Sequence, residues 1–175
     1  DDRGHGASTG DHASATSADF ADDIRAGLAY LRARPEIDGS RLALVGHSEG
    51  GLIAPMVAVS DPSLRGIVLM AGPSQTGRQI LRFQLGNAVR RDTSLTPARR
   101  DSSLATLDAS IDSLASTSTW LKYFLDYDPL VTARKVRVPT LILQGATDQQ
   151  VTAEQAGAVA ANPRTRFDQM MVLHD

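Results

Sequence analysis

The sequence predicts an α/β fold, in which short buried strands alternate with helices around a mostly parallel sheet. Three apolar runs carry this prediction: RLALV at 41–45, GIVLM at 66–70 and TLILQ at 140–144. Each run is short, continuous and bounded by polar residues, Gly or Pro, which is typical of a strand in a buried parallel sheet. Strands that alternate with helices favour right-handed crossover connections. The length of 175 residues and the 42% hydrophobic content suit a single domain, 1–175.

Helices are predicted between these strands. Residues 1–15 form an opening loop, because they are rich in Gly, Ser and Asp and hold almost no large apolar side chain. Apolar residues then recur at helical spacing over 17–34, and Pro35 ends that pattern. Two further helices are expected, one from about 49 to 59 after the first strand and one near 153–161 after the third.

The alternation stops between residues 74 and 136, where the pattern is helical, polar and rich in arginine, with no strand candidate. We therefore expect a helical insertion. Long excursions from a compact domain are often functional, so this segment is either a lid that shapes a substrate pocket or a solvated excursion without a chemical role. The sequence favours neither alternative.

Composition excludes several classes of function. The 18 Lys and Arg residues against 20 Asp and Glu give a net charge of −2, which argues against a nucleic-acid or anionic-membrane partner. The absence of cysteine excludes disulfides, thiolate metal sites and a cysteine nucleophile. No apolar run approaches the roughly 18 residues that span a bilayer, and the opening DDRGHGASTG has no signal-peptide pattern. We expect no membrane insertion, and the compartment and oligomeric state stay open.

The motif GHSEGG at 46–51 is the strongest chemical signal in the chain. A serine nucleophile on a sharp turn requires a buried strand before it and a helix after it, and both are predicted here. Gly46 and Gly50 are expected to leave room for close backbone approach around Ser48. The helix N-terminus would point N–H groups at a developing oxyanion. A glycine-rich nucleotide-binding turn is disfavoured, because neither GxGxxG nor GK[ST] follows the strand.

Four stretches of the sequence resemble α/β-hydrolase fold carboxylesterases, most closely bacterial esterases related to dienelactone hydrolases and to prolyl-oligopeptidase-type catalytic domains. They are DDRGHGASTG at 1–10, GHSEGG at 46–51, FLDYDP at 124–129 and VPTLILQGATDQQV at 138–151. The resemblance implies a partial α/β-hydrolase fold with a helical cap at 74–136. It also implies a serine hydrolase that cleaves a small-molecule carboxylic ester without a cofactor.

The resemblance identifies Asp148 as the catalytic acid, because the family places it in a GxxD turn just past the strand that follows the cap. Asp148 is expected in the loop after the strand next to that of Ser48, at the same sheet edge, with space for an imidazole between them. A helix-capping or turn aspartate is the alternative. Asp126 and Asp128 are weaker candidates, which by resemblance belong to a structural turn before Pro129.

The catalytic histidine is the main departure from the family pattern, in which the base follows the acid. His174 is the one histidine after Asp148, and aligning MMVLHD with the family's last strand places the base about three residues beyond Asp175. We therefore expect a fragment that lacks both ends, with His174 itself as the alternative base. His5 and His12 are expected to be surface loop residues. The side chain of His47 should point away from the serine and pack.

The resemblance also implies an oxyanion hole. One donor is the backbone N–H of the residue after the nucleophile, Glu49, and the other belongs to a loop after an early strand that would precede Asp1. Metal binding is disfavoured, because zinc requires convergent ligand pairs and no two histidines lie closer than seven positions. Two alternatives to an esterase remain open: a peptidase or aminopeptidase on the same scaffold, and a non-catalytic binding module.

Overall fold

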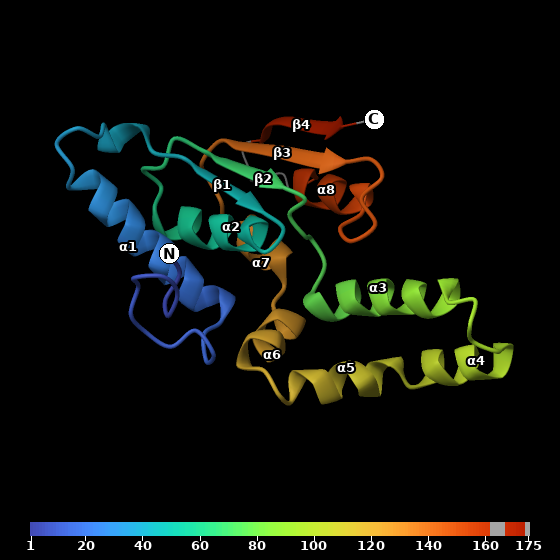
Figure 1. Cartoon of the computed structure of the whole chain (residues 1–175). Coiled ribbons are helices and arrows are strands. Elements are labelled where there is room, and N and C mark those ends of the chain that lie inside the picture. The colour runs from blue at the N-terminus through green and yellow to red at the C-terminus, as the bar shows by residue number, and fades with distance from the viewer. Residues whose placement is uncertain (162–166, 174–175) are drawn as a thin grey trace.

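A parallel sheet forms the centre of the computed structural model, which describes residues 1–161 and 167–173 (Figure 1). Within this part of the chain the strand order follows the sequence, and every neighbouring pair is parallel. The strands are β1 (Leu44–His47), β2 (Ile67–Met70), β3 (Thr140–Gly145) and β4 (Phe167–Leu173). The predicted α/β class with a mostly parallel sheet is therefore confirmed.

The first strand lies later in the sequence than predicted. Residues 41–45 were the predicted strand, but Arg41 ends a short 3-10 turn, η1 (Gly39–Arg41), in which the Asp38 side chain accepts a hydrogen bond from the N–H of Ser40. This turn competes with strand pairing at the start of the apolar run. Strand β1 consequently begins at Leu44 and continues to His47, directly before the serine of the GHSEGG motif.

Helices cover one face of the sheet (Figure 1). One hydrophobic core lies between these helices and the sheet. It includes the fully buried Val57 and the almost fully buried Ile142. The first helix begins after Thr16, whose N–H donates to the carboxylate of Asp19, which satisfies a donor that the helix leaves free. The helices on this face are α1 (Ser17–Arg32), α2 (Gly50–Ser60), α7 (Pro129–Ala133) and α8 (Ala153–Ala160).

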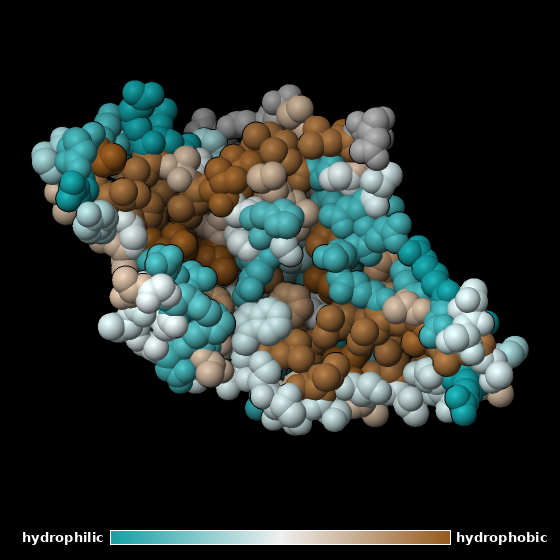
Figure 2. All heavy atoms as spheres, in the orientation of Figure 1, coloured by the Kyte–Doolittle hydropathy of each residue, from teal (hydrophilic) through white to brown (hydrophobic). Residues whose placement is uncertain are grey.

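The opposite face of the sheet carries no helix within the described residues. Its apolar side chains are open to solvent and gather over the strands in the space-filling view (Figure 2). Val45 is 68% exposed and Met70 is 38% exposed. His47 lies on the same face as Val45, since alternate residues of a strand share a face, and it too is exposed. The prediction that His47 packs is therefore wrong, because nothing in the described chain covers it.

A second group of helices leaves the sheet after β2 and returns before β3 (Figure 1). It has a small core of its own, in which Leu107, Ile111 and Leu125 are buried. Its helices are α3 (Gly77–Arg91), α4 (Pro97–Ala105), α5 (Leu107–Ala115) and α6 (Thr119–Asp126). We call residues 77–126 the helical arm. The predicted insertion extended to 136, but α7, its last helix, packs into the core beneath the sheet. No described helix is both long and apolar enough to span a membrane.

Candidate active site

Ser48 lies in a sharp turn between the end of β1 and the start of α2. We call residues 46–51 the serine turn. The backbone of Ser48 has φ of 54°, a left-handed conformation that non-glycine residues rarely adopt. Its N–H donates to the Met70 carbonyl of the neighbouring strand at 2.9 Å, and its carbonyl accepts from the Gly51 N–H at 2.8 Å. The sheet and the helix thus hold the strained backbone from both sides.

Glycine is required at two positions of the serine turn, and one of them differs from the prediction. A Cβ at Gly46 would lie 2.0 Å from the Gly50 carbonyl oxygen, and a Cβ at Gly51 would lie 2.5 Å from the Gly72 Cα. At Gly50, in contrast, a Cβ would meet nothing within 4 Å. The prediction that Gly50 leaves room for the backbone is therefore wrong. Its carbonyl is the group that crowds Gly46, and Gly51 provides the second close approach.

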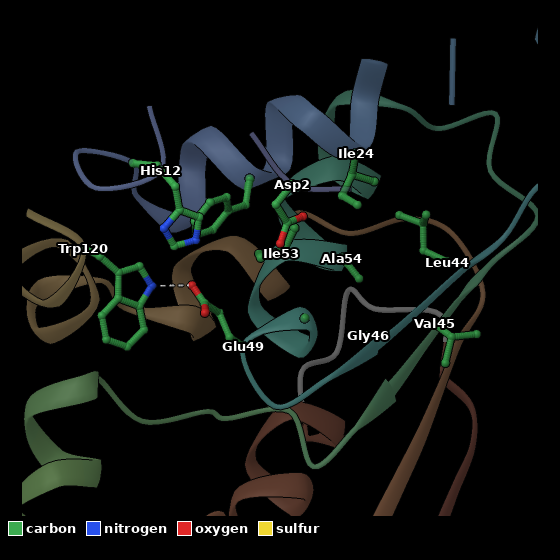
Figure 3. A pocket seen from close by; sticks show the side chains of 13 residues that line it. Asp2, His12, Ile24, Leu44, Val45, Gly46, Glu49, Ile53, Ala54 and Trp120 are labelled. Atoms are coloured by element: carbon green, nitrogen blue, oxygen red, sulfur yellow. Dashed lines mark hydrogen bonds between the residues drawn. The ribbon is translucent and has the colours of Figure 1, made fainter. Parts of the chain in front are cut away.

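Glu49 follows the serine and directly precedes α2. Its N–H has no acceptor within that helix, because the first N–H groups of a helix lack intrahelical partners. Its side chain reaches two distant elements: Oε1 accepts the Ser17 hydroxyl at 2.7 Å and the Trp120 Nε1–H at 2.6 Å. Figure 3 shows the Trp120 hydrogen bond beside the turn.

A cavity of about 390 Å³ lies on the α1 side of the serine turn (Figure 3). Glu49 and Trp120 line it together with apolar residues that include Phe20, Ile24 and Ile53. His12 also lines it, whereas the side chain of Ser48 is not part of the wall. The cavity therefore adjoins the turn without containing the serine itself.

Asp148 lies in the turn that follows β3, and we call residues 145–151 the aspartate turn. Its Oδ1 accepts the N–H of Gln150 at 2.8 Å and that of Val151 at 3.0 Å. Its Oδ2 accepts the side-chain amide of Gln144 at 3.3 Å. The carboxylate is thus oriented by three donors, as a group that must hold one position requires.

The two turns lie at the same edge of the sheet, because both follow the carboxyl ends of parallel strands. The strands that carry them are not neighbours, however, since β2 pairs with β1 on one side and with β3 on the other. The expectation that Asp148 follows the neighbouring strand is therefore wrong by one strand. Two strand spacings separate β1 from β3, or about 10 Å.

The structure describes three of the four histidines, His5, His12 and His47, and all three are exposed. His5 and His12 are exposed, as predicted, and their rings meet edge to face with centroids 4.3 Å apart. His47 points away from the helix-covered face and is exposed. The interpretation of His174 as a base lies outside the described residues. The Leu173 carbonyl just before it accepts the Ala146 N–H at 2.9 Å, so the end of β4 adjoins the aspartate turn.

Gln144 is a site residue that the sequence analysis missed. It is 1% exposed at the end of β3, and its amide nitrogen donates to the Val151 carbonyl at 2.7 Å as well as to Asp148. Its Oε1 is buried without a hydrogen-bond partner in the described chain. The sequence signal for it was a polar residue at the end of the apolar run TLILQ, because a buried amide requires hydrogen-bond partners.

The remaining polar side chains that were considered for catalysis or metal binding have no such role in the described structure. Asp128, one of the weaker acid candidates, caps α7 by accepting the Leu130 N–H at 2.9 Å. Among the described residues no group of three or more His, Asp or Glu side chains is arranged to hold a metal ion.

Comparison with known families identifies the sequence. Residues 1–172 match the sequence profile of a family described as serine aminopeptidase, S33. The chain belongs to this family. Membership in this serine hydrolase family agrees with the serine turn, and it makes the protein a hydrolase. No curated protein matches the sequence significantly.

Solved structures resemble the chain across almost its entire length. An esterase of Pyrococcus furiosus, PF2001, superposes with a TM-score of 0.63 at 16% identity, covering 99% of this chain and 59% of its own. A hydrolase of the alpha/beta fold family from Bacillus anthracis gives 0.59 at 16% identity, with 98% and 71% covered. A putative non-heme bromoperoxidase of Mycobacterium tuberculosis, BpoC, gives 0.60 at 22%, with 100% and 71% covered. At these identities the likeness establishes the α/β-hydrolase fold, and the chain spans about two thirds of these structures.

Proposed function

We propose that this family member is a serine esterase, which cleaves carboxylic esters through an acyl-enzyme. The observation that carries the proposal is the backbone of Ser48, which is held at φ of 54° between a strand and a helix, at the sheet edge that also bears Asp148. Strained residues of this kind cluster where chemistry occurs. The finer relation to dienelactone hydrolases and prolyl-oligopeptidase-type domains stays a prediction from the sequence.

In the proposed mechanism, Ser48 Oγ attacks the ester carbonyl carbon while a histidine takes the hydroxyl proton. The Glu49 N–H donates to the oxyanion that forms. The tetrahedral intermediate collapses as the imidazolium gives its proton to the departing alcohol, and an acyl-serine remains. Water then attacks this ester by the same steps and releases the acid. Asp148 accepts the second imidazole N–H, and the spacing of about 10 Å between β1 and β3 leaves room for that ring.

The histidine in this mechanism follows β4, either at His174 or beyond Asp175. The adjacency of the end of β4 to the aspartate turn, through the Ala146 N–H and the Leu173 carbonyl, supports this position. In the same proposal the helical arm acts as a cap over the carboxyl edge of the sheet. Its attachment to the aspartate turn, where Gln84 donates to the Gln150 carbonyl at 3.4 Å, supports that role.

Amide cleavage is the second candidate function. The family is described as serine aminopeptidase, and two carboxylates, Asp2 and Glu49, line the cavity beside the serine turn. Carboxylates in such a place suit the free ammonium group of an aminopeptidase substrate. An ester with an apolar acyl group uses the apolar wall instead.

Active-site labelling tests the proposal. A fluorophosphonate probe is expected to label the wild-type protein and the control Ser40→Ala, an exposed serine of η1, and to leave Ser48→Ala unlabelled. Hydrolysis of p-nitrophenyl esters and of aminoacyl p-nitroanilides by the same preparations then separates esterase from aminopeptidase. Labelling of Ser48→Ala equal to the wild type would remove Ser48 from the mechanism. An unlabelled wild type would favour a non-catalytic binding module.

A further inference from the structure

The Glu49 carboxylate joins three elements that are far apart in the sequence. Ser17, at the first position of α1, is 1% exposed and donates its hydroxyl to Glu49 Oε1. Trp120, in α6 of the helical arm, donates its indole N–H to the same oxygen from 71 positions away. Glu49 is therefore the residue at which the helical arm, α1 and the serine turn meet, and Figure 3 shows its contact with Trp120.

Trp120 packs against other residues of the helical arm, so its hydrogen bond to Glu49 affects more than its own position. Its ring is stacked on that of Phe124 with an interplanar angle of 6° and centroids 5.2 Å apart. Phe124 in turn covers Gly77, where an added Cβ would lie 2.3 Å from the Phe124 ring. A displacement of Trp120 would therefore move the start of α3 as well as α6. The hydrogen bond to Glu49 thus fixes more of the arm than one side chain.

Trp120 also forms part of the wall of the 390 Å³ cavity beside the serine turn. The opposite wall is apolar and belongs to α1 and α2, through residues such as Phe20, Ile24 and Ile53. The width of the cavity consequently depends on where α6 lies relative to the turn. Glu49 sets that position, because its carboxylate accepts the one polar hydrogen of the indole ring.

We propose that Glu49 is a positioning residue whose carboxylate fastens the helical arm to the serine turn, so that Trp120 limits the size of the apolar acyl group that the cavity accepts. This inference rests on the proposed ester hydrolysis for its effect on substrates. The structural part of the inference, in which Glu49 holds Trp120 in place, does not depend on ester hydrolysis. A hydrogen bond to a carboxylate is stronger than a neutral one, which suits a contact that must hold the helical arm in one position.

Fluorescence tests the fastening without any substrate, because Trp120 is the single tryptophan of the chain. In Glu49→Ala the emission of Trp120 is expected to shift to longer wavelength, and acrylamide to quench it faster, as the indole gains contact with water. Glu49→Gln retains an oxygen acceptor and is expected to restore most of the wild-type spectrum. The control is Glu36→Ala, which removes an exposed glutamate that pairs with Arg34. A wild-type spectrum for Glu49→Ala would overturn the proposal.

Substrate selectivity tests the consequence. Trp120→Phe keeps an aromatic ring against Phe124 and loses the N–H that Glu49 accepts. The ratio of kcat/KM for p-nitrophenyl octanoate to that for the acetate is expected to rise about tenfold, as one charge-assisted hydrogen bond predicts. Tyr30→Phe, which also removes a polar hydrogen from an aromatic side chain that is 62% exposed, is expected to leave the ratio unchanged.

The two measurements separate the inference from the proposed function. An unchanged ratio in Trp120→Phe, in a protein that hydrolyses esters, would overturn the role of Trp120 in selectivity. Absence of ester hydrolysis in the wild-type protein would overturn the proposed function, and the fluorescence of Glu49→Ala would then decide the fastening alone.

Discussion

The serine turn and the aspartate turn end two parallel strands at one edge of the sheet, yet different interactions hold them in place. Backbone contacts fix the serine turn, in which the Gly50 carbonyl and Gly72 leave no space for a Cβ at Gly46 or Gly51. Side-chain hydrogen bonds fix the aspartate turn, where Asp148 accepts two backbone N–H groups and one amide from Gln144. Steric exclusion tolerates almost no substitution, whereas a hydrogen-bonded turn tolerates any side chain that keeps the same acceptors.

The largest effect is expected when the charge of Asp148 is removed while its two hydrogen bonds from backbone N–H groups are kept. In Asp148→Asn the side-chain oxygen can still accept from Gln150 and Val151, so the free energy of unfolding should change by less than about 1 kcal/mol. The kcat should fall by about 10⁴-fold, because an amide neither fixes the imidazole tautomer nor stabilises the imidazolium. Ester hydrolysis and thermal unfolding check the two halves. Activity within tenfold of the wild type would remove Asp148 from the catalytic machinery.

The second effect is steric and tests the other turn. In Gly46→Ala the new methyl group would lie 2.0 Å from a backbone oxygen, which cannot move aside as a side chain does. We expect a loss of about 3–5 kcal/mol in the free energy of unfolding, which is in the range reserved for severe defects. Urea unfolding measures it.

Gly50→Ala is the matched control for this prediction, because its Cβ meets nothing within 4 Å. Gly50 is the first residue of α2, where alanine is the better helix former, so no loss of stability is expected. Equal destabilisation by the two substitutions would show that close backbone approach does not determine the serine turn.

These two turns also show what the sequence could predict. The strand, the serine and the helix of the serine turn were predicted, because they are adjacent in the sequence and follow a local pattern. The same reasoning chose Gly50 instead of Gly51, since the close neighbour of Gly51 is Gly72, which is 21 positions later and lies in the loop that follows β2. Asp148 was located by resemblance, which supplies tertiary information that a local pattern lacks.

The residues that contact Glu49 and Asp148 could not be predicted either, because a local sequence pattern carries no tertiary information. Trp120 and Glu49 are 71 positions apart, and no periodicity relates them. The role of Gln144 was missed because the sequence does not show that its side-chain amide donates to the aspartate turn. Its place at the end of the run TLILQ indicates only the last residue of a strand. The exposure of His47 was missed because a strand pattern predicts burial without showing which face of the sheet is covered.

A third prediction separates the support of the aspartate turn from its chemistry. Gln144→Leu removes the amide that donates to Asp148 and to the Val151 carbonyl, and it also removes the buried Oε1 that has no described partner. Loss of a donor and loss of an unsatisfied acceptor offset each other, so stability should change by about 1 kcal/mol or less. The kcat should fall about tenfold, because the carboxylate loses one of its three orienting donors. A normal kcat would mean that the backbone N–H groups alone orient Asp148.

The smallest effect is expected at the far end of α2, where Asp61 follows the helix whose beginning carries the serine turn. Arg32 Nη1 lies 2.7 Å from Asp61 Oδ2, and the hydrogen bond from Arg32, with that from the Ser63 hydroxyl, lowers the pKa of Asp61. A carboxyl whose pKa is lowered by folding stabilises the protein above its unfolded pKa of about 3.9, and this contribution is lost as the pH falls through the folded pKa.

Asp61→Asn should therefore reduce the free energy of unfolding at pH 7 by about 0.5–1 kcal/mol, the usual value for a partly exposed ion pair. The difference from the wild type should shrink as the pH falls below 3.9 and vanish once the wild-type carboxyl is protonated. Thermal unfolding across this pH range measures it, and ester hydrolysis at pH 7 should be unchanged. A change in kcat would mean that disturbance at one end of α2 reaches the serine turn at the other, and that close backbone contacts do not isolate the turn from the rest of the helix.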